Sequence, residues 1–122
     1  MTPRTFITAN LTVPGLHHWP GAHDSRAYLR DLHRHLFHIS VTIPVAHNER
    51  DTEFHDLAEI IRRLVTLEIA TDFRHDVLHF GARSCESLAG QLGELLQEVH
   101  GITPHRIMWS EDGEFSAELH YN

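Results

Sequence analysis

His33-Arg-His-Leu-Phe-His-Ile-Ser-Val-Thr-Ile43 is the stretch that decides the fold. Apolar residues occupy every second position from Phe37 onward, which is the period of a strand with one buried face. His33 and His35 share the parity of that apolar row, so two imidazoles are predicted on the inner face. Buried ring nitrogens need partners, and a metal ion is one. The alternative is a hydrogen-bonded or partly exposed pair, because a chain with 13 histidines contains a His-x-His by chance.

The other predicted strands also show alternation. Residues 6–13 alternate between apolar and polar side chains and form a strand that is interrupted at Pro14-Gly15. The strand that begins at His33 runs to Val45. Residues 106–110 and 115–121 alternate around Asp112-Gly113, a strong hairpin signal.

Two amphipathic helices are predicted between these pairs of strands. Apolar residues from Phe54 to Val65 recur at intervals of three and four, and Asp51 or Thr52 can cap this first helix. The second helix begins after Ser84, a good N-cap, and ends at Gly101.

The order strand-strand-helix-helix-strand-strand predicts an α+β fold, with a four-stranded antiparallel sheet and two helices on one face. A length of 122 residues is typical of one domain, here spanning residues 1–122. Such a sheet has two open edges, which favours assembly of several copies into a closed barrel.

Composition excludes several classes of function. The formal net charge of -7, without any lysine, argues against a nucleic-acid partner. There is no apolar run long enough to cross a membrane. The single cysteine, Cys85, excludes an intrachain disulfide framework and a cysteine-rich zinc site, and a reducing cytoplasm is the expected location. Because Cys85 lies on the apolar stripe of the second helix, an inert, packed thiol is expected.

A catalytic zinc site commonly has three protein ligands and one open position. His33 and His35 supply two, and the doublet His17-His18 lies where a paired strand could supply the third. Parity favours His17 if the strand continues past Pro14-Gly15, whereas a bulge there would favour His18. The doublet could also lie in a solvent-facing loop.

Two further clusters could carry chemistry. Glu111 falls on the apolar row of its strand, so its carboxylate needs a donor partner. A structural arginine is the favoured partner, and a ligand that offers two N–H groups in a row, such as a 2-amino-4-oxo pyrimidine ring, is the alternative. In the segment Asp72-Phe-Arg-His-Asp76, a histidine beside an aspartate could act as a general base.

Taken in order, five short segments resemble the 6-pyruvoyl-tetrahydropterin synthase / 6-carboxy-tetrahydropterin synthase family of tunnelling-fold enzymes, over nearly the whole chain. They are Leu16-His17-His18-Trp19-Pro20, His33-Arg34-His35-Leu36-Phe37, Glu53-Phe54-His55-Asp56-Leu57, Ser84-Cys85-Glu86-Ser87-Leu88-Ala89 and Ile107-Met108-Trp109-Ser110-Glu111. The resemblance implies a tunnelling fold of order ββααββ and a barrel-forming homo-oligomer such as a hexamer. It also implies a zinc-dependent lyase that acts on dihydroneopterin triphosphate or a related dihydropterin or purine-derived substrate, in pterin or queuosine (deazaguanine) biosynthesis.

The resemblance also assigns roles to individual residues. It implies that Zn²⁺ binds to His17, His33 and His35, and that Glu111 and Ser84 bind the substrate. It assigns proton transfer to a histidine in the segment before the second helix, which here is His75, with Asp76 or Asp72 in place of the family's aspartate; we take His75 and Asp76 as the candidate pair.

Three positions depart from the family pattern. Leu29 stands where the family has its catalytic cysteine, Arg34 replaces the glycine between two metal ligands, and Arg74 replaces the aspartate before the histidine. We therefore expect altered chemistry, such as a retro-aldol cleavage or an isomerisation. The alternatives are a non-catalytic protein that keeps the metal and binds a pterin or guanine-like ligand, and a surface that sequesters metal at several weak sites.

Overall fold

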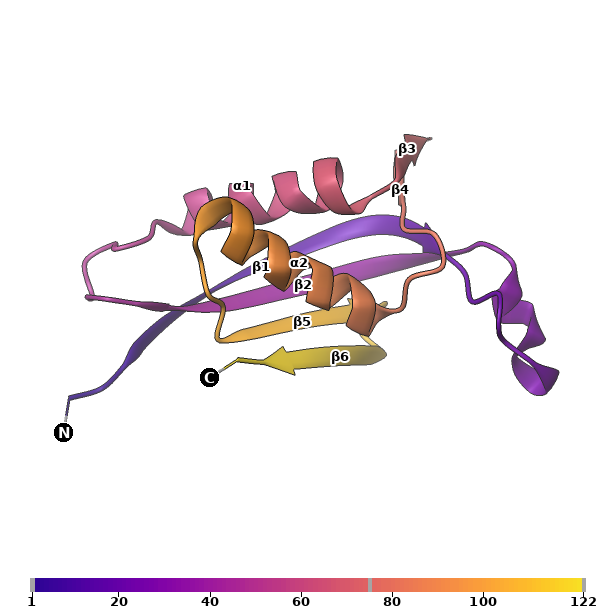
Figure 1. The fold of residues 1–122 in the computed structure, drawn as a ribbon, viewed down its shortest axis with the longest axis horizontal. Coiled ribbons are helices and arrows are strands. Elements are labelled where there is room, and N and C mark those ends of the chain that lie inside the picture. Colours follow the sequence, from indigo (N-terminus) through magenta and orange to yellow (C-terminus); the bar gives the residue numbers. More distant parts are fainter. Residues whose placement is uncertain (1, 75, 122) are drawn as a thin grey trace.

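A computed structural model describes residues 2–74 and 76–121 and shows a mixed six-stranded sheet with helices packed against it (Figure 1). In chain order the elements are β1 (Thr5–His17), the 3-10 helix η1 (Asp24–Arg30), β2 (His33–Val45), α1 (Phe54–Arg63), the π-helical segment η2 (Leu64–Ile69), β3 (Asp72–Arg74), β4 (Val77–His79), α2 (Cys85–His100), β5 (Arg106–Glu111) and β6 (Phe115–His120).

The strand order across the sheet is β3-β4-β1-β2-β5-β6. The four long strands pair antiparallel, as the alternation predicted, whereas β4 pairs with β1 in parallel at Gly15 and Leu16. The predicted four-stranded, purely antiparallel sheet is therefore wrong in its number of strands. The hairpin of β3 and β4 was missed because strands of three residues are too short to show a period of two.

The pairing of β1 with β2 runs without interruption from Thr5↔Val45 to His17↔His33. The predicted interruption at Pro14-Gly15 is wrong, and the local chemistry explains why. The C=O of Leu16 faces β4, where it accepts from the Phe80 N–H, so the nitrogen of Pro14, two residues earlier, faces the same side. No strand in the described part of the chain pairs there with Pro14, so its missing donor costs nothing.

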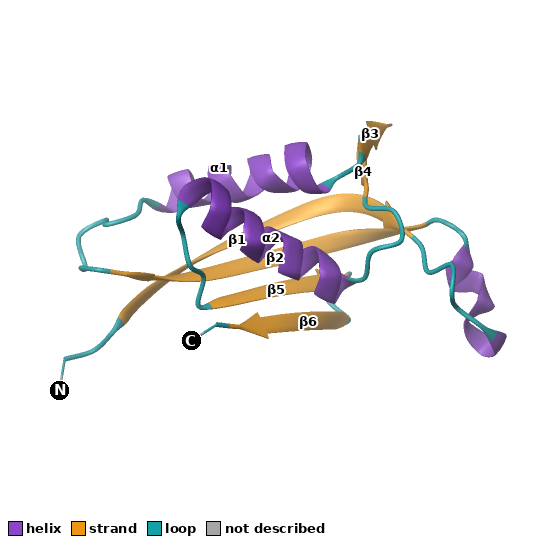
Figure 2. Ribbon diagram, viewed as in Figure 1, coloured by secondary structure: helices purple, strands orange, loops and turns teal. Residues whose placement is uncertain are grey.

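Helices α1 and α2 cover one face of the sheet, as predicted, whereas η1 lies beyond the end of the sheet (Figure 2). Helix α1 packs against β1, and α2 packs against β5 and β6. Odd-numbered residues of the four long strands point toward the helices. The largest fully buried side chains of this core are Trp109, Phe37, Phe80, Ile39, Leu57, Ile61, Ile69, Leu88, Leu92, Leu96, Ile107 and Val41. On the opposite face, the even-numbered Thr8, Asn10 and Thr12 of β1 are exposed.

The helix ends are set by local hydrogen bonds. At α2, Ser84 Oγ accepts from the Ser87 N–H at 3.1 Å, and Gly101 adopts a φ of 64°, so both predicted ends are confirmed. At α1 the predicted caps are wrong: Glu53 accepts from the Asp56 N–H at 3.0 Å. Asp51 instead accepts from Ala46 N–H at 2.7 Å, within the preceding loop. No helix of the described residues is long and apolar enough to cross a membrane.

Candidate metal centre and adjoining pocket

Three histidines meet at one end of the sheet, on the face that the helices cover. His17 ends β1 directly opposite His33, the first residue of β2, and His35 lies opposite Gly15. One nitrogen from each ring lies within 4.8 Å of the other two. The sequence left His17 and His18 as alternatives for this position. The structure brings His17 into the group, whereas His18 Nδ1 lies 3.2 Å from the Arg30 carbonyl.

Each ring has an oxygen partner at its Nδ1 atom. The contacts are His17 to the Arg83 carbonyl at 3.1 Å, His33 to the Asp31 carbonyl at 2.9 Å and His35 to the Asp112 carboxylate at 2.6 Å. Carbonyl and carboxylate oxygens only accept, so each Nδ1 carries a hydrogen and donates it. In the neutral imidazole the other nitrogen, Nε2, then keeps its lone pair. Outer hydrogen bonds of this kind fix the tautomer and orientation of histidines that bind metals.

The Nε2 atoms of His17 and His35 are buried and have no hydrogen-bond partner. Yet the Glu111 carboxylate lies 3.1 Å from His17 Nε2 and 3.6 Å from His35 Nε2. A lone pair that faces an anionic oxygen repels it unless a proton or a cation lies between them. Burial, the dominant influence, lowers the pKa of His17 against the opposing effects of the Arg83 carbonyl and Glu111, which disfavours the proton. The donor set therefore fits a metal cation with three imidazole ligands.

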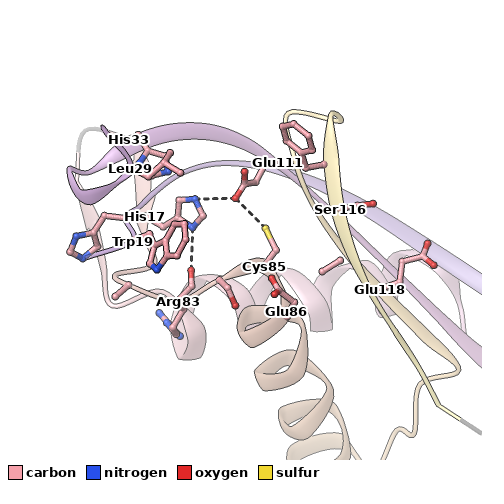
Figure 3. A pocket seen from close by; sticks show the side chains of 15 residues that line it. His17, Trp19, Leu29, His33, Arg83, Cys85, Glu86, Glu111, Ser116 and Glu118 are labelled. Carbon is pink, nitrogen blue, oxygen red and sulfur yellow. Dashed lines mark hydrogen bonds and ion pairs between the residues drawn. The ribbon is translucent and has the colours of Figure 1, made fainter. Parts of the chain in front are cut away.

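Glu111 connects this group to the second helix (Figure 3). Its Oε1 accepts from the Cys85 thiol at an Sγ–O distance of 3.5 Å. Burial and the neighbouring Glu111 raise the pKa of Cys85 to about 12, so the thiol is protonated and inert, as its place on the apolar stripe predicted. The favoured structural arginine partner for Glu111 is wrong: no arginine of residues 2–74 and 76–121 pairs with this carboxylate.

A pocket of about 690 Å³ opens beside the histidines, a volume typical of small-molecule sites. Its walls come from the connection between β1 and β2, from the beginning of α2 and from the β5–β6 hairpin (Figure 3). Both Glu111 and Ser84, the predicted substrate-binding residues, line it. The Ser84 hydroxyl already accepts from Ser87 N–H, so its own hydrogen is what it could offer a ligand. Leu29 also lines the pocket, at the position where the resemblance expects a cysteine.

Of the predicted proton-transfer pair, the structure describes only Asp76, and it does not place Asp76 at this pocket. Asp76 is exposed in the turn of the β3–β4 hairpin, with a φ of 61°, and does not line the pocket. His75 lies outside the described residues. Asp72, the alternative to Asp76, forms an ion pair with Arg74.

Sequence reasoning missed the residues that hold the histidines in place. Asp112 was interpreted only as a turn residue, yet its carboxylate contacts His35. Hydrogen bonds from Leu36 N–H and then from His35 lower the pKa of Asp112, which keeps it ionised. Arg83 was not singled out at all. Its guanidinium binds the Phe80 carbonyl at 3.0 Å and also the side chain of Gln91, which fixes the loop whose carbonyl faces His17.

Several solved structures share this fold. An uncharacterised protein from Wolinella succinogenes is similar with a TM-score of 0.69 and 13% identity, over 99% of this chain and 100% of that one. The 6-pyruvoyl tetrahydropterin synthase of Plasmodium vivax gives a TM-score of 0.58 and 13% identity, over 99% of both chains. The Plasmodium falciparum enzyme of the same name gives 0.52 and 12%, over 98% of this chain and 99% of that one.

No protein-family model and no curated protein matches the sequence. At 12–13% identity the structural likeness establishes the fold alone. The chain thus has the tunnelling fold of 6-pyruvoyl tetrahydropterin synthase, as the sequence resemblance implied.

Proposed function

We propose that the chain binds one zinc ion through His17, His33 and His35 and acts on a pterin or related purine-derived molecule as a lyase-type enzyme. The observation that carries this proposal is the pair of buried, unpartnered Nε2 atoms of His17 and His35, which face the Glu111 carboxylate. The fold of a pterin synthase supports the substrate class.

The neutral imidazoles described above are the form in which histidine binds a metal, and three of them leave a fourth position for substrate or water. Zinc bound there would polarise a substrate oxygen as a Lewis acid. The Glu111 carboxylate can accept two N–H groups from a 2-amino-4-oxo pyrimidine ring lying in the pocket. Ser84, at the beginning of α2, would donate to the same ligand.

Proton transfer remains assigned to His75 and Asp76. Because Asp76 does not line the pocket of its own chain, this assignment goes together with the proposed homo-oligomer, in which a neighbouring copy would supply the pair. Leu29 offers no acid or base, and the Cys85 thiol is protonated. Chemistry that differs from the family's, such as a retro-aldol cleavage or an isomerisation, therefore fits this pocket better.

The same observations favour a second candidate, a binding protein that keeps the metal and the pocket without turnover. Among the described residues that line the pocket, the one thiol is inert and the position expected to hold a cysteine is a leucine. This candidate would bind a pterin or guanine-like ligand and release it unchanged.

The first experiment is the zinc content per chain of untagged protein, measured by plasma mass spectrometry for the wild type and for His35→Ala. We expect one zinc per chain in the wild type and a loss in the variant. His38→Ala is the matched control, because His38 lies on the same strand but contacts Thr12 on the opposite face. The absence of stoichiometric zinc after reconstitution would contradict the proposal. Several weak sites insensitive to His35→Ala would support a metal-sequestering surface.

The second experiment offers dihydroneopterin triphosphate and related dihydropterins to the zinc-loaded protein, with products followed by mass spectrometry and binding by calorimetry. A product supports the enzyme, and saturable binding without a product supports the binding protein. We expect Glu111→Gln to abolish ligand binding while zinc is retained, since an amide cannot accept both N–H groups. Loss of zinc from Glu111→Gln would instead make Glu111 a metal ligand, and a lack of any binding would overturn the pterin proposal.

A further inference from the structure

Asp112 joins the β5–β6 turn to the strand that carries two of the histidines. Its backbone N–H donates to the Leu36 carbonyl at 2.8 Å, and its Oδ1 accepts from the Leu36 N–H at 2.7 Å. Its Oδ2 accepts from His35 Nδ1 at 2.6 Å. The backbone at Asp112 has a φ of 56°, in the left-handed region that aspartate and asparagine tolerate better than most residues.

These three bonds leave the carboxylate little freedom. Rotating Oδ2 away from His35 would break the bond between Oδ1 and the Leu36 N–H. The bond to Leu36 therefore keeps the carboxylate oriented toward His35. In addition, His35 is the one histidine of the group whose Nδ1 partner is a side chain, because His17 and His33 donate to main-chain carbonyls. A single substitution at Asp112 can therefore change the orientation of one ring and leave the other two alone.

We propose that Asp112 is a positioning residue for the metal site: it holds His35 in the tautomer and ring orientation that present Nε2 to the cation. This inference rests on the proposed function, since it concerns the same three-histidine site. An anionic partner at Nδ1 also makes Nε2 a more basic ligand, and loss of such outer partners typically weakens metal binding about 10- to 100-fold.

Asp112→Asn tests the tautomer directly. Asparagine keeps the left-handed turn. Because the Leu36 N–H can only donate a hydrogen bond, the amide oxygen of asparagine must face it. Its NH₂ group then faces His35 Nδ1 and donates to it, which forces the hydrogen of the imidazole onto Nε2. The same exchange of carboxylate for amide imposes the wrong tautomer in Ser-His-Asp triads. We expect the zinc dissociation constant to rise about 10- to 100-fold.

The comparison variants isolate this effect. Asp112→Gly keeps the backbone conformation but removes the side chain, so His35 can adopt either tautomer and the loss of affinity should be smaller than for Asp112→Asn. Glu114→Gln removes one negative charge from the same turn, where the side chain is exposed and forms no hydrogen bond among the described residues. Its zinc affinity should equal that of the wild type.

Zinc dissociation constants are measured by competition with a chromophoric chelator, and the tautomer of His35 in the metal-free protein by ¹⁵N NMR of the imidazoles. We expect a hydrogen on His35 Nδ1 in the wild type and none on that atom in Asp112→Asn. Equal zinc affinity of Asp112→Asn and Glu114→Gln, or an unchanged tautomer, would overturn the role of Asp112. A wild-type protein that binds no zinc would overturn the proposed function itself, which is a different result.

Discussion

Gly15 is a strand residue beside the candidate metal site. It lies opposite His35 in the pairing of β1 with β2, and the Phe37 and Phe80 rings pack over its Cα. A Cβ atom at this position would lie 2.6 Å from a Phe80 carbon and 2.8 Å from two Phe37 carbons. Both rings are fully buried, so neither can move aside.

We expect Gly15→Ala to lower the free energy of unfolding by about 1–3 kcal/mol, the usual cost of overpacking a core. The alanine would gain only about 0.4–1 kcal/mol from a less flexible unfolded chain. Because the clash costs more than this gain, the net effect on the free energy of unfolding is destabilising. Urea denaturation of the two proteins measures the difference. An unchanged or higher stability would show that the rings above Gly15 can relax.

At the level of elements, α2 contains two glycines with opposite surroundings. A Cβ at Gly90 would lie 3.8 Å from Leu119 Cδ1, an ordinary contact. At Gly93 it would collide with the Tyr121 phenol and lie 3.3 Å from Ile107 Cδ1, which belongs to the buried core. The contact of α2 with β5 and β6 therefore depends on the missing side chain of Gly93.

We expect Gly90→Ala to stabilise the protein by roughly 0.5–1 kcal/mol, because alanine is the better helix former. Gly93→Ala has the same helix preference but must displace Tyr121 from its place on the core, so we expect it to be less stable than Gly90→Ala by about 1–3 kcal/mol. Thermal unfolding of the matched pair measures this difference. Two variants of equal stability would refute the tight packing at Gly93.

Elements with a long repeat were predictable from sequence, and the others were not. The 13 residues of β2 and the 16 of α2 show enough of their periods to identify type, face and caps. The strands of the β3–β4 hairpin are too short for that, and the π-helical turns of η2 continue the apolar stripe of α1 without a distinct pattern. In the site, the inward direction of His33 and His35 could be predicted, because both share the odd-numbered positions of the apolar residues in their strand. The partners of their Nδ1 atoms depend on the fold, because Asp112 lies 77 residues from His35.

At the level of the whole molecule, the sheet presents backbone groups at both of its sides. Tyr121 N–H, at an odd-numbered position, donates to the His105 carbonyl on the β5 side, so even-numbered residues of β6 direct their N–H groups outward. On the far side, β1 has no strand partner beyond β2 from Thr5 to Pro14 in the described part of the chain. Such unpaired edges favour pairing with further copies, which is the basis of the proposed oligomer.

Ser116→Pro tests this assembly. Proline there removes an outward-facing N–H but spares the hydrogen bonds between β5 and β6, so the proposed oligomer should dissociate toward a 14.0 kDa chain. Light scattering coupled to size exclusion measures the mass, with Ser116→Ala as the control. A wild-type mass equal to that of a single chain would contradict the proposed oligomer. An unchanged oligomeric mass in Ser116→Pro would exclude pairing through the edge of β6.

The connection between β1 and β2 leaves the sheet at His17 and returns at His33, two residues that face each other across the strands. In between, Ala22 is the one buried residue, and a hydrogen bond runs from Trp19 N–H to the Leu29 carbonyl at 2.7 Å, within the segment. Substitutions within residues 18–30 can thus alter this segment while the strand pairing keeps His17 and His33 in place, provided that the Asp31 carbonyl stays beside His33. Since Trp19 and Leu29 also line the pocket, substitutions in this segment would change the contacts to a ligand and leave the sheet unchanged.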